Sequence, residues 1–390
     1  AIVVNDHLQT TQPHIWALGD VCSPPMLKHL ANQQARVVKQ NLLAERDRRP
    51  LATSREAHVP QGVFGDPEIA FVGATEQQLI DTVADCDSRG EPVLILGGGS
   101  NVLIADEGFD GTVVKVATRG VCVETADCSG AQLEVAAGET WDHLVARTVA
   151  SQWSGLEALS GIPGSVGAVP IQNVGAYGAE VATLIQRVHT WDRSERRIRS
   201  FAAAECGFGY RDSCFKREKG RHLVLRVDFQ LPLGDLGHPI RYPELARALG
   251  VEVGQRAPAV HVRKTVLAIR RRKGMVLDEN DHDTWSAGSF FTNPILTPEQ
   301  AASLPAEAPR FSADGGIKTS AAWLIQHAGF PAGHGTGPAR LSTRHVLALT
   351  NRGHATTADV LDLAREIRDG VRERFGITLA PEVNLVGVSI

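Results

Sequence analysis

The stretch that most constrains the fold is segment 161–178, which holds five glycines and two prolines. Glycine weakens helices and strands because it has the most backbone freedom to lose, and proline lacks the amide hydrogen that both structures use. We therefore expect an irregular loop whose backbone amides can surround a planar cofactor, with the side chains of Gln172 and Asn173 available to its edge. The expected cofactor contacts are Gly161, Pro163, Gly164, Ser165, Gly167, Gln172, Asn173 and Gly175.

A second glycine-rich loop, Gly97-Gly98-Gly99-Ser100-Asn101, follows the apolar run 92–96. Successive glycines let the backbone approach an anion closely, and their amides can form an anion-binding nest. The loop departs from the dinucleotide fingerprint GxGxxG, because Val102 stands where the last glycine would be. Taken alone, it is equally well explained as a tight turn between strands. Together with segment 161–178, it predicts cofactor contacts at all five of its residues.

The chain divides into three regions. Residues 1–75 contain an apolar run over 15–18, an expected helix over 27–43 and a polar linker over 45–60. Residues 76–232 alternate short β-rich runs with glycine turns, and residues 255–390 show more helical spacing.

Helical and strand patterns predict particular elements in the last two regions. The expected strands are 92–96, 111–116, 132–136 and 222–229, behind a helix that carries Leu79 and Val83. The clearest helix covers 359–375, where apolar residues recur at helical spacing before Gly376. Because strands and helices mix without a regular βαβ repeat, the predicted fold class is α+β.

Charge and cysteine usage exclude several classes of function. The net charge of −4 and the isoelectric point near 6.4 argue against nucleic acid or an anionic membrane as a partner. No apolar run approaches membrane-spanning length, and the start of the chain lacks the basic flank and apolar core of a signal peptide. The six cysteines show no CxxC pair or metal-ligand spacing, which predicts free thiols in a reducing cytoplasm and no structural metal.

Three further segments together indicate flavin-dependent reduction of a double bond that bears a carboxylate: 208–213, 286–293 and 379–383. Hydride addition to such a bond places negative charge on the carboxylate side, so the site needs a permanent cation and a proton donor. Arg211 suits the first role because a guanidinium stays charged when desolvated. Ser289 could donate the proton, and Glu382 could orient the intermediate or a water.

Each of these residues also has a structural explanation. Arg211 could pair with the adjacent Asp212, Ser289 could cap a turn, and Glu382 could begin a solvated strand. Their joint occurrence in this order favours the catalytic interpretation.

Two more positions are candidates for substrate binding. The basic group 270–273 is most often a solvated helix face, but Lys273 is its best candidate for binding a diphosphate or carboxylate. Tyr242 could close over a sugar phosphate, and it could equally be a surface tyrosine beside a proline.

Seven segments of the chain resemble one known family: LILGGGSNVLIAD, SGIPGSVGAVPIQNVGAYGAEV, FGYRDSCFK, RKGMVLD, SAGSFFTNP, KTSAAWLIQHAGF and LAPEVNLVG. Over about residues 76–390 the chain resembles the UDP-N-acetylenolpyruvoylglucosamine reductases (UDP-N-acetylmuramate dehydrogenases), flavoenzymes of peptidoglycan synthesis. The resemblance implies an FAD-binding domain of the vanillyl-alcohol-oxidase (PCMH) type over 76–232. It also implies an α+β substrate-binding domain over 255–390.

The resemblance further implies that NADPH reduces FAD and that hydride then passes to UDP-N-acetylglucosamine-enolpyruvate, giving UDP-N-acetylmuramate. The family's proton donor falls on Ser289, and its intermediate-stabilising arginine and glutamate fall on Arg211 and Glu382. Its substrate contacts fall on Tyr210, Lys273, Asn293 and, as the loop tyrosine of one subclass, Tyr242. The oligomeric state stays open, a monomer included.

The first 75 residues resemble a different family. Segments 9–11, 15–21, 27–29 and 63–76 resemble part of a flavoprotein disulfide reductase of the mycothione reductase type. The chain has no Cys-x4-Cys, so we expect no disulfide chemistry from this fragment. The usual opening strands of the first family are not found, although residues 70–72 could replace one of them. The alternative reading is therefore a non-catalytic or unstable fusion remnant that at most binds FAD.

Overall fold

The computed structural model describes residues 9, 38 and 69–390. The linker expected over 45–60 lies outside the described residues. So do the helix expected over 27–43, apart from Val38, and the disulfide-reductase-like fragment, apart from Gln9 and its last residues.

A parallel three-stranded sheet begins the described chain. Its strands lie in the order β1 (Ile69–Gly73), β4 (Thr112–Val116) and β2 (Val93–Leu96). Helix α2 (Glu76–Ser88) begins at Thr75, whose side chain and that of Gln78 form a capping box. The helix buries Leu79 and Val83 toward this sheet. Residues 70–72 thus lie in an edge strand that pairs with β4.

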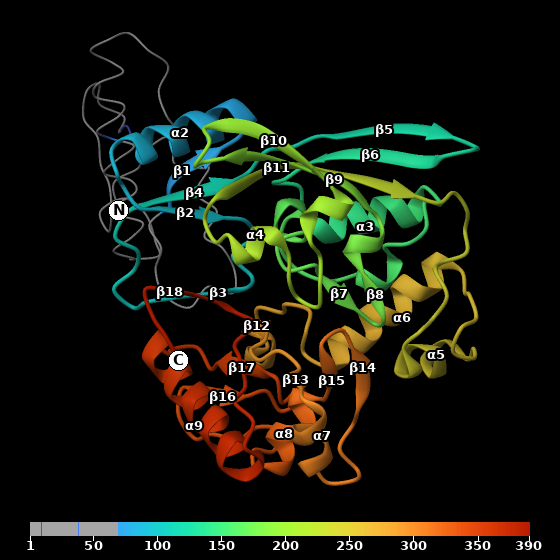
Figure 1. The fold of residues 1–390 in the computed structure, drawn as a ribbon, viewed down its shortest axis with the longest axis vertical. Coiled ribbons are helices and arrows are strands. Elements are labelled where there is room, and N and C mark those ends of the chain that lie inside the picture. The colour runs from blue at the N-terminus through green and yellow to red at the C-terminus, as the bar shows by residue number, and fades with distance from the viewer. Residues whose placement is uncertain (1–8, 10–37, 39–68) are drawn as a thin grey trace.

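A larger antiparallel sheet forms the long upper layer in Figure 1, with the strand order β10-β9-β11-β6-β5. Its strands are β5 (Val121–Ala126), β6 (Gly130–Ala136), β9 (Ile185–Asp192), β10 (Arg197–Ala202) and β11 (His222–Leu231). Trp141 of helix α3 (Trp141–Ala150) packs against Phe229 of β11, with ring centroids 6.1 Å apart. Both rings are fully buried, so hydrophobic burial joins the helix to the sheet.

Segment 161–178 is irregular, as its composition predicts. It holds one short 3₁₀ turn (Val166–Ala168) and strand β7 (Gly175–Ala176), which pairs with β8 (Ala179–Glu180).

The C-terminal part contains two small antiparallel sheets, with the strand orders β12-β17-β16 and β13-β15-β14. Their strands are β12 (Ser286–Ser289), β13 (Ile295–Leu296), β14 (Phe311–Ala313), β15 (Gly316–Lys318), β16 (Ala339–Leu341) and β17 (Ala348–Asn351). Its helices are α7 (Pro298–Ser303), α8 (Ala321–His327) and α9 (Thr357–Phe375). Helices α5 (Pro243–Leu249) and α6 (Ala259–Arg272) precede these sheets and form a small core of their own. Helix α9 confirms the helix predicted over 359–375, and it ends at Gly376 with a φ of +68°.

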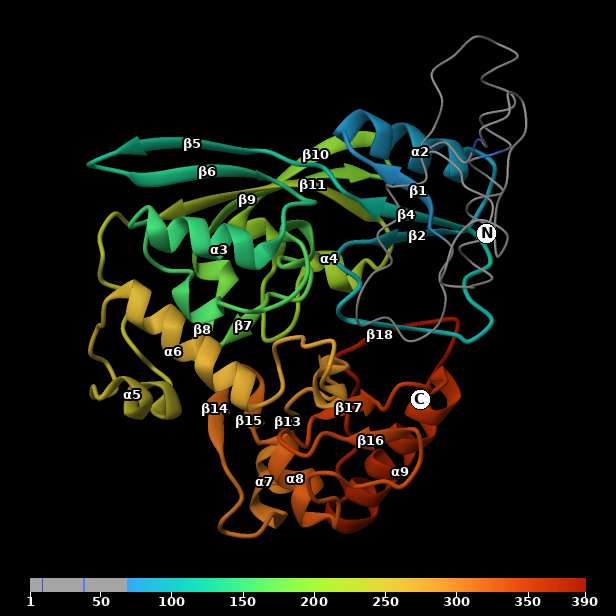
Figure 2. The ribbon, with the colours of Figure 1, turned by 180° about the vertical axis from the view of Figure 1, so that it is seen from behind.

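A short segment near the C-terminus joins the C-terminal sheets to the first part of the chain, and Figure 2 shows this junction from behind. Strand β18 (Asn384–Val386) pairs in parallel with β3 (Val102–Ile104), which directly follows the first glycine loop. Leu103 of β3 lies in the C-terminal core. The Asp106 carboxylate accepts hydrogen bonds from the Thr357 and Ala358 amides at 2.6 and 3.1 Å, in the first turn of α9. The end of the chain is therefore fixed against the first glycine loop.

The four predicted strands of the middle region are confirmed within one or two residues, and so is the α+β class. In the part of the chain that the structure describes, no helix combines the length and the apolar character needed to cross a membrane.

Candidate active site

A cavity of about 410 Å³, here called the catalytic pocket, lies where the two glycine loops meet strand β12 and the chain end. Its wall includes most of the residues selected from the sequence: Gly97, Gly98, Gly99, Ser100, Asn101, Pro163, Gly164, Ser165, Gln172, Gly175, Arg211, Tyr242, Lys273, Ser289 and Glu382. Segments almost 300 residues apart in the chain therefore form one site.

The two glycine loops pack so closely that side chains could not replace their glycine hydrogens. A Cβ on Gly98 would lie 2.6 Å from the Gly164 Cα, and a Cβ on Gly97 would lie 2.6 Å from the Ser165 Oγ. Gly164 also has a φ of +108°, which residues with a side chain rarely adopt. Because the loops lack side chains here, their backbone amides can approach a planar or anionic group closely. The loops therefore fit FAD.

A second cavity, of about 770 Å³, shares Gly98 and Gly164 with the catalytic pocket. We call it the basic cavity, because it is lined by four cations, Lys115, Arg263, Arg270 and Arg271, and by the two carboxylates Asp142 and Glu279. The balance is two positive charges, which suits the diphosphate of a dinucleotide such as FAD.

Two of these cations make no ion pair among the described residues, and of the two Lys115 is half-buried and Arg270 is buried. Lys115 extends from β4 and donates to the Gly97 carbonyl, and burial lowers the pKa of its ammonium. Arg270 is 6% exposed and donates to the carbonyls of Gly161 and Met275 at 3.1 Å each, and burial lowers its pKa as well. A buried cation is costly unless an anion compensates it, so both residues fit an anionic cofactor.

Lys115 is not among the residues predicted from the sequence, although a charge within an apolar strand was an available signal. Interpreting the basic group 270–273 as a solvated helix face is wrong for Arg270, which is buried because α6 turns it toward segment 161–178.

Arg211 and Glu382 form an ion pair at the catalytic pocket. The Arg211 Nε donates to the Glu382 Oε1 at 2.8 Å, and its Nη2 donates to the Gly175 carbonyl at 2.7 Å. Glu382 is held in turn by its own amide, which donates to the Phe290 carbonyl at 2.7 Å. The ion pair of Arg211 with Asp212 does not form, because Asp212 pairs with Arg217.

Ser289 ends strand β12 opposite Ala348 of β17 and lines the catalytic pocket with Glu382. Within residues 69–390 its hydroxyl makes no hydrogen bond, so it is available to a bound molecule. The next two residues, Phe290 and Phe291, are buried in the C-terminal core and fix the strand end in place.

The predicted substrate contacts divide into two groups. Tyr242 and Lys273 line the catalytic pocket, and Lys273 pairs there with Glu244 at 2.5 Å. Tyr210 and Asn293 do not line it. The Asn293 Oδ1 accepts a hydrogen bond from the Ala321 amide at 2.9 Å, and burial raises the pKa of the Tyr210 phenol.

Three predicted cofactor contacts lie away from the wall of the catalytic pocket. Asn173 is buried, and its side chain bonds to Glu180, the Gly209 carbonyl and the Ala182 amide at 3.0–3.1 Å. Gly167 packs against Ala137, where a Cβ would come within 2.5 Å, and Gly161 lines only the basic cavity. Asn173 and Gly167 thus contact the rest of the protein and hold the loop in place.

Asn101 links the two glycine loops to Glu382 and to strand β18. Its Nδ2 donates to the Gln172 Oε1 at 3.0 Å and approaches the Glu382 carbonyl at 3.4 Å. Its carbonyl accepts from the backbone and side-chain nitrogens of Asn384, both at 3.1 Å. The side-chain amides of Asn101 and Gln172 thus hydrogen-bond to each other, which uses part of their capacity to bind a ligand.

The fold and this site define a class, that of FAD-dependent oxidoreductases with a separate substrate-binding domain. Residues 67–199 match the family model described as an FAD binding domain, and residues 279–386 match the one described as the UDP-N-acetylenolpyruvoylglucosamine reductase C-terminal domain. The chain belongs to the UDP-N-acetylenolpyruvoylglucosamine reductase family.

Individual relatives support that assignment. The UDP-N-acetylenolpyruvoylglucosamine reductase of Cutibacterium acnes is 57% identical over 332 residues, which cover 84% of this chain and 88% of the relative. That of Thermobifida fusca is 51% identical over 87% of this chain and 100% of its own length. The solved UDP-N-acetylenolpyruvylglucosamine reductase of Thermus caldophilus is similar with a TM-score of 0.56 at 26% identity, covering 84% of this chain and 95% of that one.

Proposed function

We propose that the protein catalyses the NADPH-dependent, FAD-mediated reduction of UDP-N-acetylglucosamine-enolpyruvate to UDP-N-acetylmuramate. The observation that carries the proposal is the meeting of the Arg211–Glu382 pair and the free Ser289 hydroxyl in one pocket walled by both glycine loops. The family relationship supports the same reaction. FAD, reduced by NADPH, supplies the hydride when it is bound.

Arg211 acts on the charge that the hydride creates. Addition at the enolpyruvyl methylene carbon moves an electron pair toward the substrate carboxylate, and a guanidinium nearby stabilises that charge. Glu382 holds the Arg211 Nε, while the Gly175 carbonyl holds its Nη2, so the cation is oriented before substrate arrives. The Ser289 hydroxyl then donates a proton to the neighbouring carbon, which completes the addition of one hydride and one proton.

The roles proposed for most of the other residues in binding substrate and FAD follow from where these residues lie. Lys273 and Tyr242 on the pocket wall would contact the diphosphate and sugar of the substrate, whereas Tyr210 and Asn293 are proposed as substrate contacts from the family resemblance alone. The basic cavity would hold the diphosphate of FAD beside Lys115 and Arg270.

Three further points belong to the proposal. We infer a cytoplasmic location, where NADPH and the nucleotide substrate are available, and no nucleic-acid or membrane partner; a monomer would suffice for this chemistry. From resemblance alone, we infer that residues 1–75 derive from a flavoprotein disulfide reductase, and no step depends on them.

Substituting Ser289→Ala tests the assignment of the proton donor. Reduction of the flavin by NADPH should proceed as in the unsubstituted protein, because Ser289 takes no part in it. Reoxidation by the enolpyruvyl substrate should slow by about 10²–10⁴-fold, the usual effect of losing a positioned acid. Stopped-flow absorbance measures both half-reactions.

Ser312→Ala, an exposed serine of β14, is the matched control and should change neither rate. An unchanged reoxidation rate in Ser289→Ala would remove Ser289 from the mechanism.

A further inference from the structure

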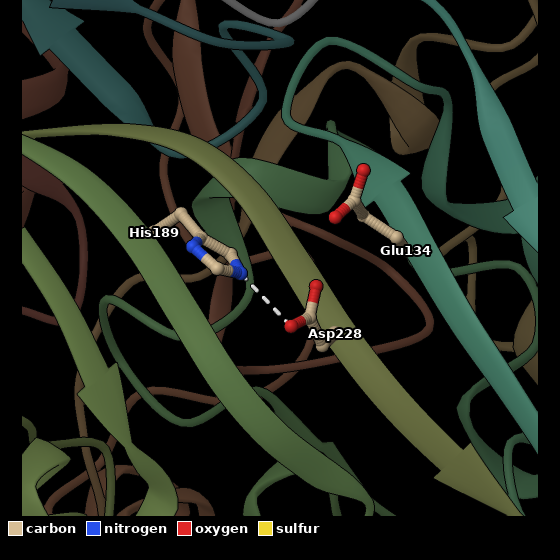
Figure 3. Close-up of side chains that lie close together, drawn as sticks. All are labelled: Glu134, His189 and Asp228. Atoms are coloured by element: carbon tan, nitrogen blue, oxygen red, sulfur yellow. Dashed lines mark hydrogen bonds and ion pairs between the residues drawn. The ribbon is translucent and has the colours of Figure 1, made fainter. Parts of the chain in front are cut away.

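Three side chains that have no part in the proposed reaction converge on one face of the five-stranded sheet. Glu134 extends from β6, His189 from β9 and Asp228 from β11, and Figure 3 shows them turned toward one another across the central strand. The His189 Nε2 and the Asp228 Oδ2 are 2.8 Å apart. One potential ligand atom from each residue lies within 4.8 Å of the other two. None of the three residues lines the catalytic pocket or the basic cavity.

The strand register explains why the two carboxylates meet. Asp228 and Glu134 are direct partners across the β11–β6 ladder, so their side chains share a face. Like charges directly opposite one another destabilise a sheet unless a cation lies between them. The Asp228 Oδ1 is also buried, and it has no hydrogen-bond partner in the described part of the chain.

The cations of the chain only partly balance this charge. Arg226 contacts both Glu134 and Glu76 at 2.8 Å, so it would keep one partner if Glu134 turned toward an ion. Arg187 lies opposite Asp228 in the β11–β9 register. Three carboxylates therefore face two guanidinium groups, which leaves a net negative charge for a bound cation to neutralise.

His189 is already oriented as a ligand. Its Nδ1 lies 2.8 Å from the Ser200 Oγ, its cross-strand partner on β10. Metal-binding histidines usually hydrogen-bond through one ring nitrogen, which fixes the ring and presents the other nitrogen to the ion. Ser200 fills this supporting role, with the Nε2 directed at the two carboxylates.

We propose that Glu134, His189 and Asp228 bind a divalent transition-metal cation, with Zn²⁺ as the best match. Imidazole nitrogen and carboxylate oxygen both ligate Zn²⁺ in proteins, and water would complete the coordination that these three side chains begin. The ion would tie β6, β11 and β9 together, so its role is structural. The sequence predicts no metal because the three ligands are 39 to 55 residues apart, without the short spacing of recognised motifs.

The test is Zn²⁺ binding to the FAD-loaded protein by isothermal titration calorimetry, with Co²⁺ absorbance as a second readout of ligand geometry. His189→Gln and Asp228→Asn each remove one ligand while retaining size and polarity. Each should weaken binding at least about 10-fold, and Ser200→Ala should weaken it by roughly 10–100-fold as a supporting residue does. Visible flavin absorbance confirms that each variant is folded.

His334→Gln is the matched control, because His334 also contacts a carboxylate, that of Glu366, at 2.9 Å but belongs to no such cluster. It should leave the affinity unchanged. Zn²⁺ should also raise the Tm of the unsubstituted protein and of His334→Gln, and not that of His189→Gln.

Two results would overturn the proposal. One is the absence of stoichiometric binding by the unsubstituted protein. The other is equal affinity in His189→Gln and Asp228→Asn, which would place any bound Zn²⁺ elsewhere and leave the cluster as a hydrogen-bonded group only.

Discussion

Arg211 has a φ of +54°, in the left-handed region where glycine is unstrained and other residues are not. Asn173 and Tyr177 share this conformation, with φ of +42° and +51°. Each such residue costs on the order of 1 kcal/mol or more, and strain of this kind collects at functional sites. At Arg211 the two hydrogen bonds that the guanidinium makes in this conformation, to Glu382 and to the Gly175 carbonyl, help to offset the cost.

His345 is a largely buried histidine whose lowered pKa makes the stability of the fold depend on pH. Burial, together with the nearby charges of Lys273 and Arg270, lowers its pKa to about 4 from the ordinary 6.5. Between these two pH values the unfolded chain binds the proton and the folded chain does not. The stability that neutral His345 contributes is therefore complete above about pH 6.5 and is lost as the pH falls toward 4.

His345→Gln should flatten this part of the stability profile. The free energy of unfolding of the unsubstituted protein should fall between pH 7 and pH 4 by about 3 kcal/mol more than that of the variant. Urea denaturation across this range measures the difference, with His261→Gln, an exposed histidine of α6, as control. Parallel profiles for the unsubstituted protein and His345→Gln would contradict the assignment. Asp192, with a pKa of about 2, titrates below this window.

How far the site could be predicted differs from residue to residue. Local motifs were enough to select Arg211, Ser289 and Glu382, which meet in the catalytic pocket, while their roles remain predictions. The same reasoning failed to show that the Asn173 side chain points away from the pocket, because its partner carbonyl at Gly209 is 36 residues distant. It also missed Lys115, whose importance appears only when β4 is placed beside the first glycine loop.

At the scale of elements, periodicity predicted strands and helices well and long-range pairing poorly. Strands β2, β4 and β11 and helix α9 follow from alternation and helical spacing within their own residues. The pairing of β3 with β18 joins residues 282 positions apart, so no local pattern could reveal it. As a result, the sequence assigned residues 102–104 to the FAD-binding region, whereas Leu103 packs in the C-terminal core.

The contribution of strand β1 to stability can be tested by two deletions at the N-terminus. Removing residues 1–60 leaves β1 intact and should leave flavin content and turnover nearly unchanged. Removing residues 1–73 keeps the capping box of α2 but deletes β1, which exposes the edge of β4 and the apolar face that Leu79 covers. The shorter chain should lose several kcal/mol of a stability that totals about 5–15 kcal/mol in typical domains.

Chemical denaturation and flavin absorbance compare the two deletions. Equal stability in both would show that β1 is dispensable. Loss of soluble, yellow protein on removing residues 1–60 alone would show that the preceding segment supports the fold.

At the scale of the whole molecule, two hydrophobic cores meet at the catalytic pocket. One core includes the FAD-binding sheets and α3, and the other includes α9 and the sheets that carry Ser289. Glycine loops come from the first part, and Ser289 and Glu382 come from the second, so neither part holds a complete site. The β3–β18 pairing and the Asp106 contacts with α9 keep the two halves in register.

The central claim is that these two halves together pass hydride from NADPH to the enolpyruvyl substrate. The most direct measurement is flavin absorbance of the FAD-loaded protein under anaerobic conditions, with NADPH added first and UDP-N-acetylglucosamine-enolpyruvate second. We predict bleaching by NADPH and full recovery of the oxidised spectrum after the substrate is added. A protein that holds no flavin, or that bleaches and does not recover, would contradict the account and favour a non-catalytic fusion remnant.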